Sequence, residues 1–139
     1  MSGSGKPTGL FIVFEGPEGS GKSTQSGVLA RRILGAGLEV VLTREPGGTD
    51  LGERVRGLLL RERKFPDVEP RVQALLMLAA RAQHIEERIR PSLRQGGVVI
   101  CDRFAASTLA YQGAGFGLDV DALADINDFA TDGIRADLT

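Results

Sequence analysis

An apolar run, a glycine-rich octapeptide and a helical pattern follow one another near the start of this chain, and this order constrains the fold most. The octapeptide from Gly16 to Ser23 reads Gly-Pro-Glu-Gly-Ser-Gly-Lys-Ser and fits the spacing G-x-x-x-x-G-K-[ST]. Its glycines let backbone N–H groups turn inward around phosphate oxygens, Lys22 can reach the outer phosphates, and the Ser23 hydroxyl can ligate Mg²⁺. The sequence therefore predicts a strand, a phosphate-binding loop and a helix whose N-terminus points at bound phosphate.

Strand-like and helix-like segments alternate along the rest of the chain. Strands are expected at Leu10–Phe14, 39–43 and 98–101, and helices from the loop to Gly35 and at about 51–60, 71–93, 106–112 and 120–130. In the helix at 71–93 the residues expected to face inward are Val72, Leu75, Leu76, Ala79, Ala80, Ile85 and Ile89. This alternation predicts an α/β fold of the P-loop NTPase type, with a parallel sheet and helices on both faces in three α/β/α layers.

Composition indicates an ordinary globular domain. The chain has 139 residues, 42% of them hydrophobic, and a formal net charge of −1. A charge so close to zero gives no general attraction to nucleic acid or to anionic lipid. The sequence has no run long enough to span a membrane and no secretory signal, and its one cysteine, Cys101, cannot form an internal disulfide. A cytoplasmic protein is expected.

Candidate functional residues follow the predicted strands. In a parallel sheet ligands bind beyond the carboxyl ends of the strands. We therefore expect the loop after Phe14, the turn-rich loop 44–49 and the pair Asp102-Arg103 to lie together at one edge of the sheet. Asp102 is a candidate to hold Mg²⁺, directly or through water, and an N-cap role is the alternative. Arg103 can clamp a phosphate, with a surface ion pair as the alternative.

Three more side chains need an interpretation. Arg81 lies among apolar and small neighbours and would need a partner if buried, although a solvated helix face remains open. His84 is expected to face solvent or to cap a contact, and a metal role is not expected because no second His or Cys lies at ligand spacing. Cys101 is expected to be an inert core residue.

Three motifs in order resemble the bacterial type of thymidylate kinase. They are Phe-Glu-Gly-Pro-Glu-Gly-Ser-Gly-Lys-Ser-Thr at 14–24, Thr-Arg-Glu-Pro-Gly-Gly-Thr at 43–49, and Asp-Arg-Phe at 102–104 with Ser-Thr-Leu-Ala-Tyr-Gln-Gly at 107–113. The resemblance implies transfer of the γ-phosphoryl group of ATP to dTMP, with Mg²⁺, in a homodimer that binds neither nucleic acid nor membrane. It also implies a P-loop nucleoside monophosphate kinase domain at 10–139, incomplete at its C-terminus, after residues 1–9, whose composition predicts a mobile tail.

The resemblance also assigns roles to residues. The ATP site would comprise Gly16, Pro17, Glu18, Gly19, Ser20, Gly21, Lys22, Ser23 and Thr24. The dTMP site would comprise Glu18, Pro46, Arg56, Met77, Arg81, Arg103, Thr108, Tyr111 and Gln112. Lys22, Asp102 and Arg103 would be catalytic, and Ser23 and Asp102 would hold the metal.

Two positions depart from the pattern of relatives. Met77 stands where relatives stack an aromatic ring on thymine, and its thioether offers a less defined surface for the base. Gly19 stands where some relatives carry a loop arginine, and relatives without that arginine supply catalytic arginines from a mobile lid instead. That lid and the C-terminal strands are expected to be missing, since a buried strand begins to form at Arg135–Thr139.

Alternatives remain beside the kinase. One is a kinase for a different nucleoside or deoxynucleoside monophosphate, which the loop at 43–49 and the pair Tyr111-Gln112 disfavour. Another is a nucleotide-binding fragment without turnover. A GTPase switch is disfavoured because neither D-x-x-G after a strand nor N-K-x-D occurs.

Overall fold

Three parallel strands form the sheet that the apolar runs predict. The computed structural model describes residues 9–16, 19–61, 69–104, 117 and 119–139. Strands β1 (Leu10–Phe14), β2 (Val40–Arg44) and β3 (Val98–Asp102) lie in the order β1-β3-β2. The predicted strands are thus confirmed, with ends shifted by at most one residue. β3 lies in the middle and pairs with two strands that are remote from each other in sequence.

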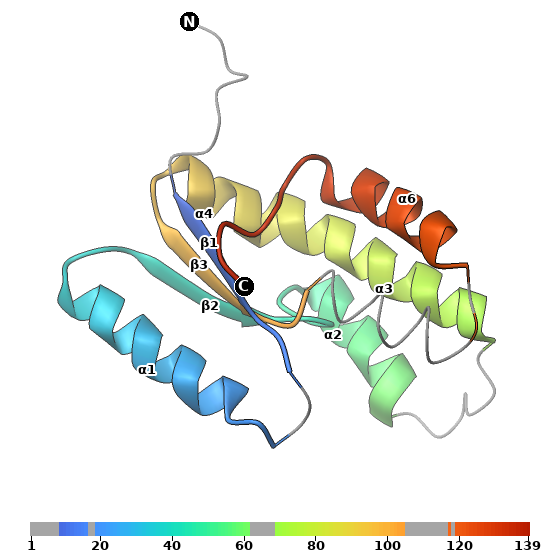
Figure 1. Cartoon of the computed structure of the whole chain (residues 1–139), viewed down its shortest axis with the longest axis horizontal. Helices are drawn as coiled ribbons and strands as arrows, with labels where there is room; N and C mark the ends of the chain where they lie inside the picture. The colour runs from blue at the N-terminus through green and yellow to red at the C-terminus, as the bar shows by residue number, and fades with distance from the viewer. Residues whose placement is uncertain (1–8, 17–18, 62–68, 105–116, 118) are drawn as a thin grey trace, which may run out of the picture.

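Helices cover both faces of the sheet (Figure 1). α1 (Lys22–Gly35) packs on the face that carries Ile12 and Ile100, through Ala30 and the partly buried Leu29 and Ile33. The opposite face carries Phe11, Val13, Val99 and Cys101, and it packs against Ile85, Ile89, Leu93, Phe104 and Ile134. Alternate residues of each strand thus enter two different cores, as the period of a strand requires. The three-layer α/β/α arrangement is confirmed.

The helices of the second face form one group. They are α2 (Asp50–Arg56), the π-helical turn η1 (Gly57–Arg61), α3 (Pro70–His84), the π-helical turn η2 (Ile85–Ile89), α4 (Arg90–Arg94) and α6 (Val120–Thr131). α3, η2 and α4 follow without a break and correspond to the long helix predicted at 71–93. The Thr49 side chain caps α2 by accepting from the N–H of Gly52, and Asp119 caps α6 through the N–H groups of Asp121 and Ala122. The helix predicted at 106–112 lies outside the described residues.

One predicted helix face is partly wrong. Val72, Leu75 and Ala79 are exposed and Leu76 is half-buried, whereas Ala80, Ile85 and Ile89 are buried as expected. Ala74, Leu78 and Arg81, which were not predicted to face inward, are buried as well. α3 lies between α2 and α6 (Figure 1), so its inward stripe is set by these neighbours as well as by the sheet. The turn η2 adds a residue to the helical repeat, which rotates the buried face between α3 and α4.

The segment after α6 returns to β1. Leu138 forms a parallel bridge with Ile12, and the N–H of Val13 donates to the carbonyl of Leu138 at 2.9 Å. The Asp137 carboxylate accepts from the N–H of Phe11 at 2.8 Å. The strand-like character expected at the end of the sequence is therefore visible as pairing along β1.

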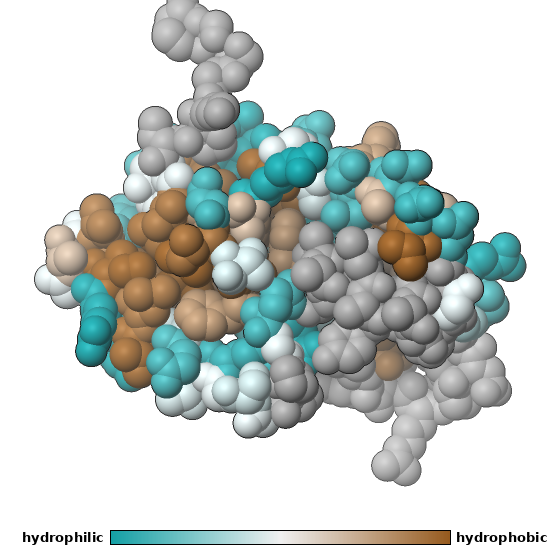
Figure 2. Space-filling view, viewed as in Figure 1, coloured by the Kyte–Doolittle hydropathy of each residue, from teal (hydrophilic) through white to brown (hydrophobic). Residues whose placement is uncertain are grey.

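At the other end of β1 the N–H of Gly9 donates to the carbonyl of Leu93 at 2.9 Å. The rest of the predicted tail, residues 1–8, lies outside the described residues. On the face shown in Figure 2, apolar residues gather over α1 and the strands. Within the described ranges no helix combines the length and the apolar character needed to cross a lipid bilayer.

Candidate active site

The strand register brings three loops to one edge of the sheet. Asp102 at the end of β3 pairs with Phe14 on one side and with Arg44 on the other. Beyond the strands, the N–H of Arg103 donates to the carbonyl of Phe14, and the N–H of Glu45 donates to the carbonyl of Asp102. The three segments that the sequence places on this edge therefore begin side by side at the same level.

The glycine-rich loop has the backbone conformation that its composition predicts. Gly16, Gly19 and Gly21 have φ angles of 151°, 79° and 88°, which disfavour residues with a Cβ atom. Gly21 is the N-cap of α1 and gives it no side-chain cap, so a bound anion can occupy the positive end of the helix. Pro17 and Glu18 lie outside the described residues, while Ser20 and Thr24 are exposed at this end of α1.

Lys22, Ser23 and Asp102 come together where α1 begins. Lys22 is 8% exposed, and its Nζ lies 3.8 Å from Oδ1 of Asp102. The Ser23 hydroxyl donates to Oδ2 of Asp102 at 3.4 Å. Asp102 Oδ1 is buried and accepts no hydrogen bond from the part of the chain that the structure describes. A hydroxyl and a carboxylate oxygen with unused acceptor capacity suit a hard cation.

The residues present thus fit Mg²⁺ but do not enclose it. Among the described residues no group of three or more His, Cys, Asp or Glu side chains is arranged to hold a metal. Mg²⁺ beside a phosphate loop needs only one or two protein ligands, because water and phosphate oxygens complete its octahedron. Ser23 and Asp102 are the pair that can supply them.

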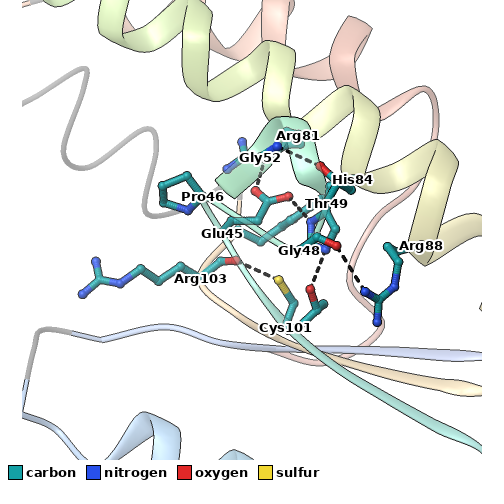
Figure 3. Close-up of polar contacts among 12 residues, drawn as sticks. Glu45, Pro46, Gly48, Thr49, Gly52, Arg81, His84, Arg88, Cys101 and Arg103 are labelled. Atoms are coloured by element: carbon teal, nitrogen blue, oxygen red, sulfur yellow. Dashed lines mark hydrogen bonds and ion pairs between the residues drawn. The ribbon is translucent and has the colours of Figure 1, made fainter. Parts of the chain in front are cut away.

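A second polar cluster is buried behind the loop that follows β2 (Figure 3). Glu45, at 4% exposure, accepts from Arg81 Nε through Oε1 at 2.6 Å. Its other oxygen, Oε2, lies 2.7 Å from Nδ1 of His84. Arg81 also donates through Nη1 to Oδ1 of Asn127 at 2.6 Å, and its guanidinium lies 4.7 Å from the centre of the Phe104 ring. The buried arginine is therefore paired, and the solvated helix face is wrong for Arg81.

His84 corrects the sequence-based expectation. The ring is fully buried rather than solvent-facing, and its Nε2 lies 2.7 Å from the hydroxyl of Thr43. Glu45 was not singled out by sequence reasoning, and neither was Asn127. The signal for Glu45 was a carboxylate directly before Pro-Gly-Gly at the end of a strand, but nothing near it in sequence identifies its partners.

The loop after β2 is held tightly against this cluster. A Cβ atom on Gly48 would collide with the His84 ring and with the Thr43 hydroxyl, and Gly48 has a φ of 81°. The peptide bond between Glu45 and Pro46 is cis, and the carbonyl of Pro46 accepts from Nη1 of Arg56 at 3.1 Å. Pro46 and Arg56, both predicted site residues, are thereby joined.

The remaining predicted site residues are distributed as follows. Met77 is half-buried on α3, one turn before Arg81. Arg103 has a φ of 73°, and its side chain extends away from the Glu45 cluster (Figure 3). Thr108, Tyr111 and Gln112 lie outside the described residues. The neighbouring Cys101 is fully buried, and burial raises the pKa of its thiol well above the usual value, so its predicted inertness agrees with its environment.

A groove of about 320 Å³ opens beside Asp102, lined in part by Ser23, Thr43, Arg44, Gly48 and Arg88. On its wall Arg44 donates to Glu53 at 2.9 Å, and this hydrogen bond is the main cause that lowers the pKa of the Glu53 carboxyl. The groove therefore presents guanidinium groups and the carboxylate of Asp102 to solvent next to the start of α1.

A parallel sheet with a glycine-rich loop, a buried lysine and an edge carboxylate defines a P-loop nucleotide-binding protein. The family profile described as thymidylate kinase matches residues 14–139. Thymidylate kinases of Pseudomonas fluorescens strains Pf-5 and Pf0-1 are 54% and 56% identical over 132 residues, or 95% of this chain. The crystal structure of thymidylate kinase from Ehrlichia chaffeensis superposes with a TM-score of 0.84 at 46% identity, covering 94% of this chain and 72% of that one.

The chain belongs to the thymidylate kinase family. It spans 62% of the length of the Pseudomonas relatives. The resemblance stated from the three motifs is thereby confirmed, as is the class of fold.

Proposed function

We propose that the protein takes part in the ATP-dependent phosphorylation of dTMP to dTDP, ATP + dTMP → ADP + dTDP. The observation that carries this proposal is the convergence of Lys22, Ser23 and Asp102 at the end of β3, in a chain of this family. Phosphoryl transfer of this kind depends mainly on alignment and on positive charge around the transferring group. The attacking group is an ionised phosphate oxygen, so the reaction needs no dedicated base.

The donor site is proposed at the glycine-rich loop. Backbone N–H groups of residues 16–24 hold the ATP phosphates, and Lys22 contacts their outer oxygens. The low exposure of Lys22 supports this role, because a buried ammonium is strongly attracted to an incoming phosphate. Ser23 and Asp102 hold Mg²⁺, which neutralises charge on the transferring phosphoryl group when bound.

The acceptor site is proposed on the other side of Asp102. Arg103 clamps the dTMP phosphate, and Arg81 and Met77 on α3 lie toward the base. Pro46 and Arg56 line the acceptor pocket, and Glu18 approaches the sugar 3′-hydroxyl. Thr108 and Gln112 face the thymine edge, and Tyr111 packs against the deoxyribose. Support comes from the shared position of Arg81, Pro46 and Arg56 around the loop after β2.

Titration of the purified 139-residue chain with dTMP and with MgATP tests the proposal. Calorimetry reports binding, and coupled ADP release in the same buffer reports turnover. Binding of dTMP in preference to dCMP and dGMP, with ADP release that requires dTMP, is the expected result. Binding without turnover would instead favour the nucleotide-binding fragment, and preference for another monophosphate would favour the kinase of different specificity.

Homodimerisation and a cytoplasmic location belong to the same proposal. The outer residues of three adjacent helices include exposed apolar side chains, namely Leu51 on α2, Val72 and Leu75 on α3, and Val120, Ile126 and Phe129 on α6. Phe129 is 87% exposed, which is unusual for a large aromatic residue without a partner surface. The single cysteine is free and buried, which is compatible with a reducing compartment.

A further inference from the structure

The single histidine of this chain, His84, has a hydrogen-bond partner at each ring nitrogen although it is completely buried. Nδ1 lies 2.7 Å from Oε2 of Glu45, and Nε2 lies 2.7 Å from the hydroxyl of Thr43. Here the ring joins the end of β2 to the loop that follows it (Figure 3).

The partners fix which nitrogen carries the proton. A carboxylate oxygen of Glu45 can only accept, so Nδ1 must donate to it. The Thr43 hydroxyl can donate or accept and therefore suits Nε2 in either state. In its neutral form the ring is accordingly the Nδ1–H tautomer.

Glu45 links His84 to Arg81 through its two carboxylate oxygens. One carboxylate oxygen faces His84, and the other accepts from Arg81 Nε at 2.6 Å. Without a donor at Nδ1, Oε2 of Glu45 would be a buried charged oxygen without a hydrogen bond, which is costly. The carboxylate would then rotate toward another donor and move the guanidinium that it holds.

We infer that His84 is a positioning residue for the acceptor site, acting through Glu45 to orient Arg81 and the loop 45–49. The inference rests on the proposed function, because it assigns Arg81 to the base of dTMP. His84 does not contact the nucleotide in this scheme. Its contribution is the donor at Nδ1, which keeps the carboxylate in one orientation.

Two substitutions distinguish the hydrogen bond made by Nδ1 from the one made by Nε2. The side-chain amide of Asn lies about as far from the backbone as Nδ1, and that of Gln reaches about as far as Nε2. His84→Asn can thus keep the bond to Glu45 and lose that to Thr43, while His84→Gln does the reverse. Helix propensity favours Gln over Asn, so a merely structural role predicts the opposite order. Gln83→Asn, at an exposed neighbour in the same turn, is the matched control.

Calorimetry on the 139-residue chain gives the first readout. We expect His84→Asn to bind dTMP within about threefold of wild type and His84→Gln to bind it about tenfold more weakly, since a misplaced positioning group can cost up to about 10²-fold. Affinity for MgATP should stay unchanged in both. Equal losses in the two variants, or losses that follow their melting temperatures, would overturn the inference.

Nitrogen NMR gives a second readout that needs no nucleotide. In wild type the neutral ring should carry its proton on Nδ1, and the Arg81 Nε–H signal should shift in His84→Gln but not in His84→Asn. An Nε2–H tautomer, or an Arg81 signal that His84→Gln leaves in place, would refute the positioning role. The tautomer is measured on wild type, so it decides even where a variant fails to fold. Absence of dTMP binding in wild type would count against the proposed function alone.

Discussion

Each carboxylate oxygen of Asp102 contacts a different side chain at the start of α1. Its two carboxylate oxygens face different partners, Oδ1 toward Lys22 and Oδ2 toward Ser23. The side chain is 22% exposed, so water can still reach it. A carboxylate placed in this way can exchange its protein partners for a cation when phosphate arrives, because Lys22 at 3.8 Å is attracted but not tightly bound.

Lys22→Ala should remove the positive charge that the side chain places beside the glycine-rich loop. We expect kcat to fall by on the order of 10² to 10³, the usual cost of losing a positioned transition-state charge, and MgATP affinity to fall as well. Coupled ADP release and calorimetry provide the measurements. Arg32→Ala, which removes an exposed cation from the last turn of α1, is the control and should behave as wild type. More than half of the wild-type kcat in Lys22→Ala would contradict the donor assignment.

Arg103→Ala should weaken dTMP binding and lower kcat while leaving ATP affinity nearly unchanged. Arg103 has a φ of 73°, a conformation that glycine adopts more readily than other residues. Arg103→Gly should therefore lose as much dTMP affinity as Arg103→Ala. Its melting temperature should nevertheless be higher than that of Arg103→Ala. Calorimetry with each nucleotide and thermal melts check both points. A variant in which ATP binding weakens and dTMP binding does not would move Arg103 to the donor side.

At the scale of elements, glycines in the loop between β2 and α2 and in the first turn of α2 leave no room for a side chain. Gly48 lies against Thr43 and His84, and a Cβ atom on Gly52 would meet the carbonyl of Gly47. The loop is therefore packed against the buried cluster at the backbone level. Its shape depends on the absence of side chains at these positions as much as on the carboxylate of Glu45.

Gly48→Ala should destabilise the fold by about 2 kcal/mol or more, because it combines a positive φ with a steric clash in a buried site. Gly57→Ala is the matched control. Gly57 has helical angles of −57° and −49° and nothing within 4 Å of an added Cβ, so the same substitution should stabilise by about 0.5–1 kcal/mol. Chemical denaturation of the two variants measures both effects. Similar changes in both would show that the loop can relax around a methyl group.

The strands and the phosphate loop were predictable because their signals are local. Leu10–Phe14 and Val98–Cys101 are continuous apolar runs, and the glycine spacing at 16–23 admits few other conformations. The Glu45 cluster was not predictable in this way. His84 has a polar side chain at the end of α3, and its two hydrogen-bond partners come from β2 and the following loop, about 40 residues away in sequence. Long-range pairing of this kind leaves no periodicity in the sequence.

At the scale of the whole molecule, the outer surface of α2, α3 and α6 needs an explanation. The periodicity of 71–93 predicted Val72 and Leu75 to be inside, and both are exposed. Apolar residues that the sequence pattern predicts to be buried, but that lie exposed on the surface, are typical of an interface between copies of a chain. The sequence pattern and the structure agree if this surface is buried in the proposed homodimer.

Phe129→Asp should shift the chain from dimer to monomer in light scattering at micromolar concentration. The charge would have to be buried without a partner in the interface, which disfavours association strongly. Wild type should also show a melting temperature that rises with concentration, and Phe129→Asp should lose that dependence. Leu34→Asp, at an exposed apolar position on α1, is the control and should leave the mass unchanged. A monomeric wild type would refute the dimer.

The strand order has a consequence for how the chain acquires its structure. Among the described residues that follow it, β1 has no strand partner before β3, because Leu10 pairs with Val98 and β2 pairs with β3. At a synthesis rate of about 5–20 residues per second, the apolar segment Leu10–Phe14 therefore waits for several seconds outside the ribosome before it can enter a sheet. During that interval it can be shielded by helical segments alone, first by α1 and later by η2 and α4, which pack on its other face. Conditions that slow elongation between β2 and β3 should consequently increase aggregation of the nascent chain without changing the stability of the finished protein.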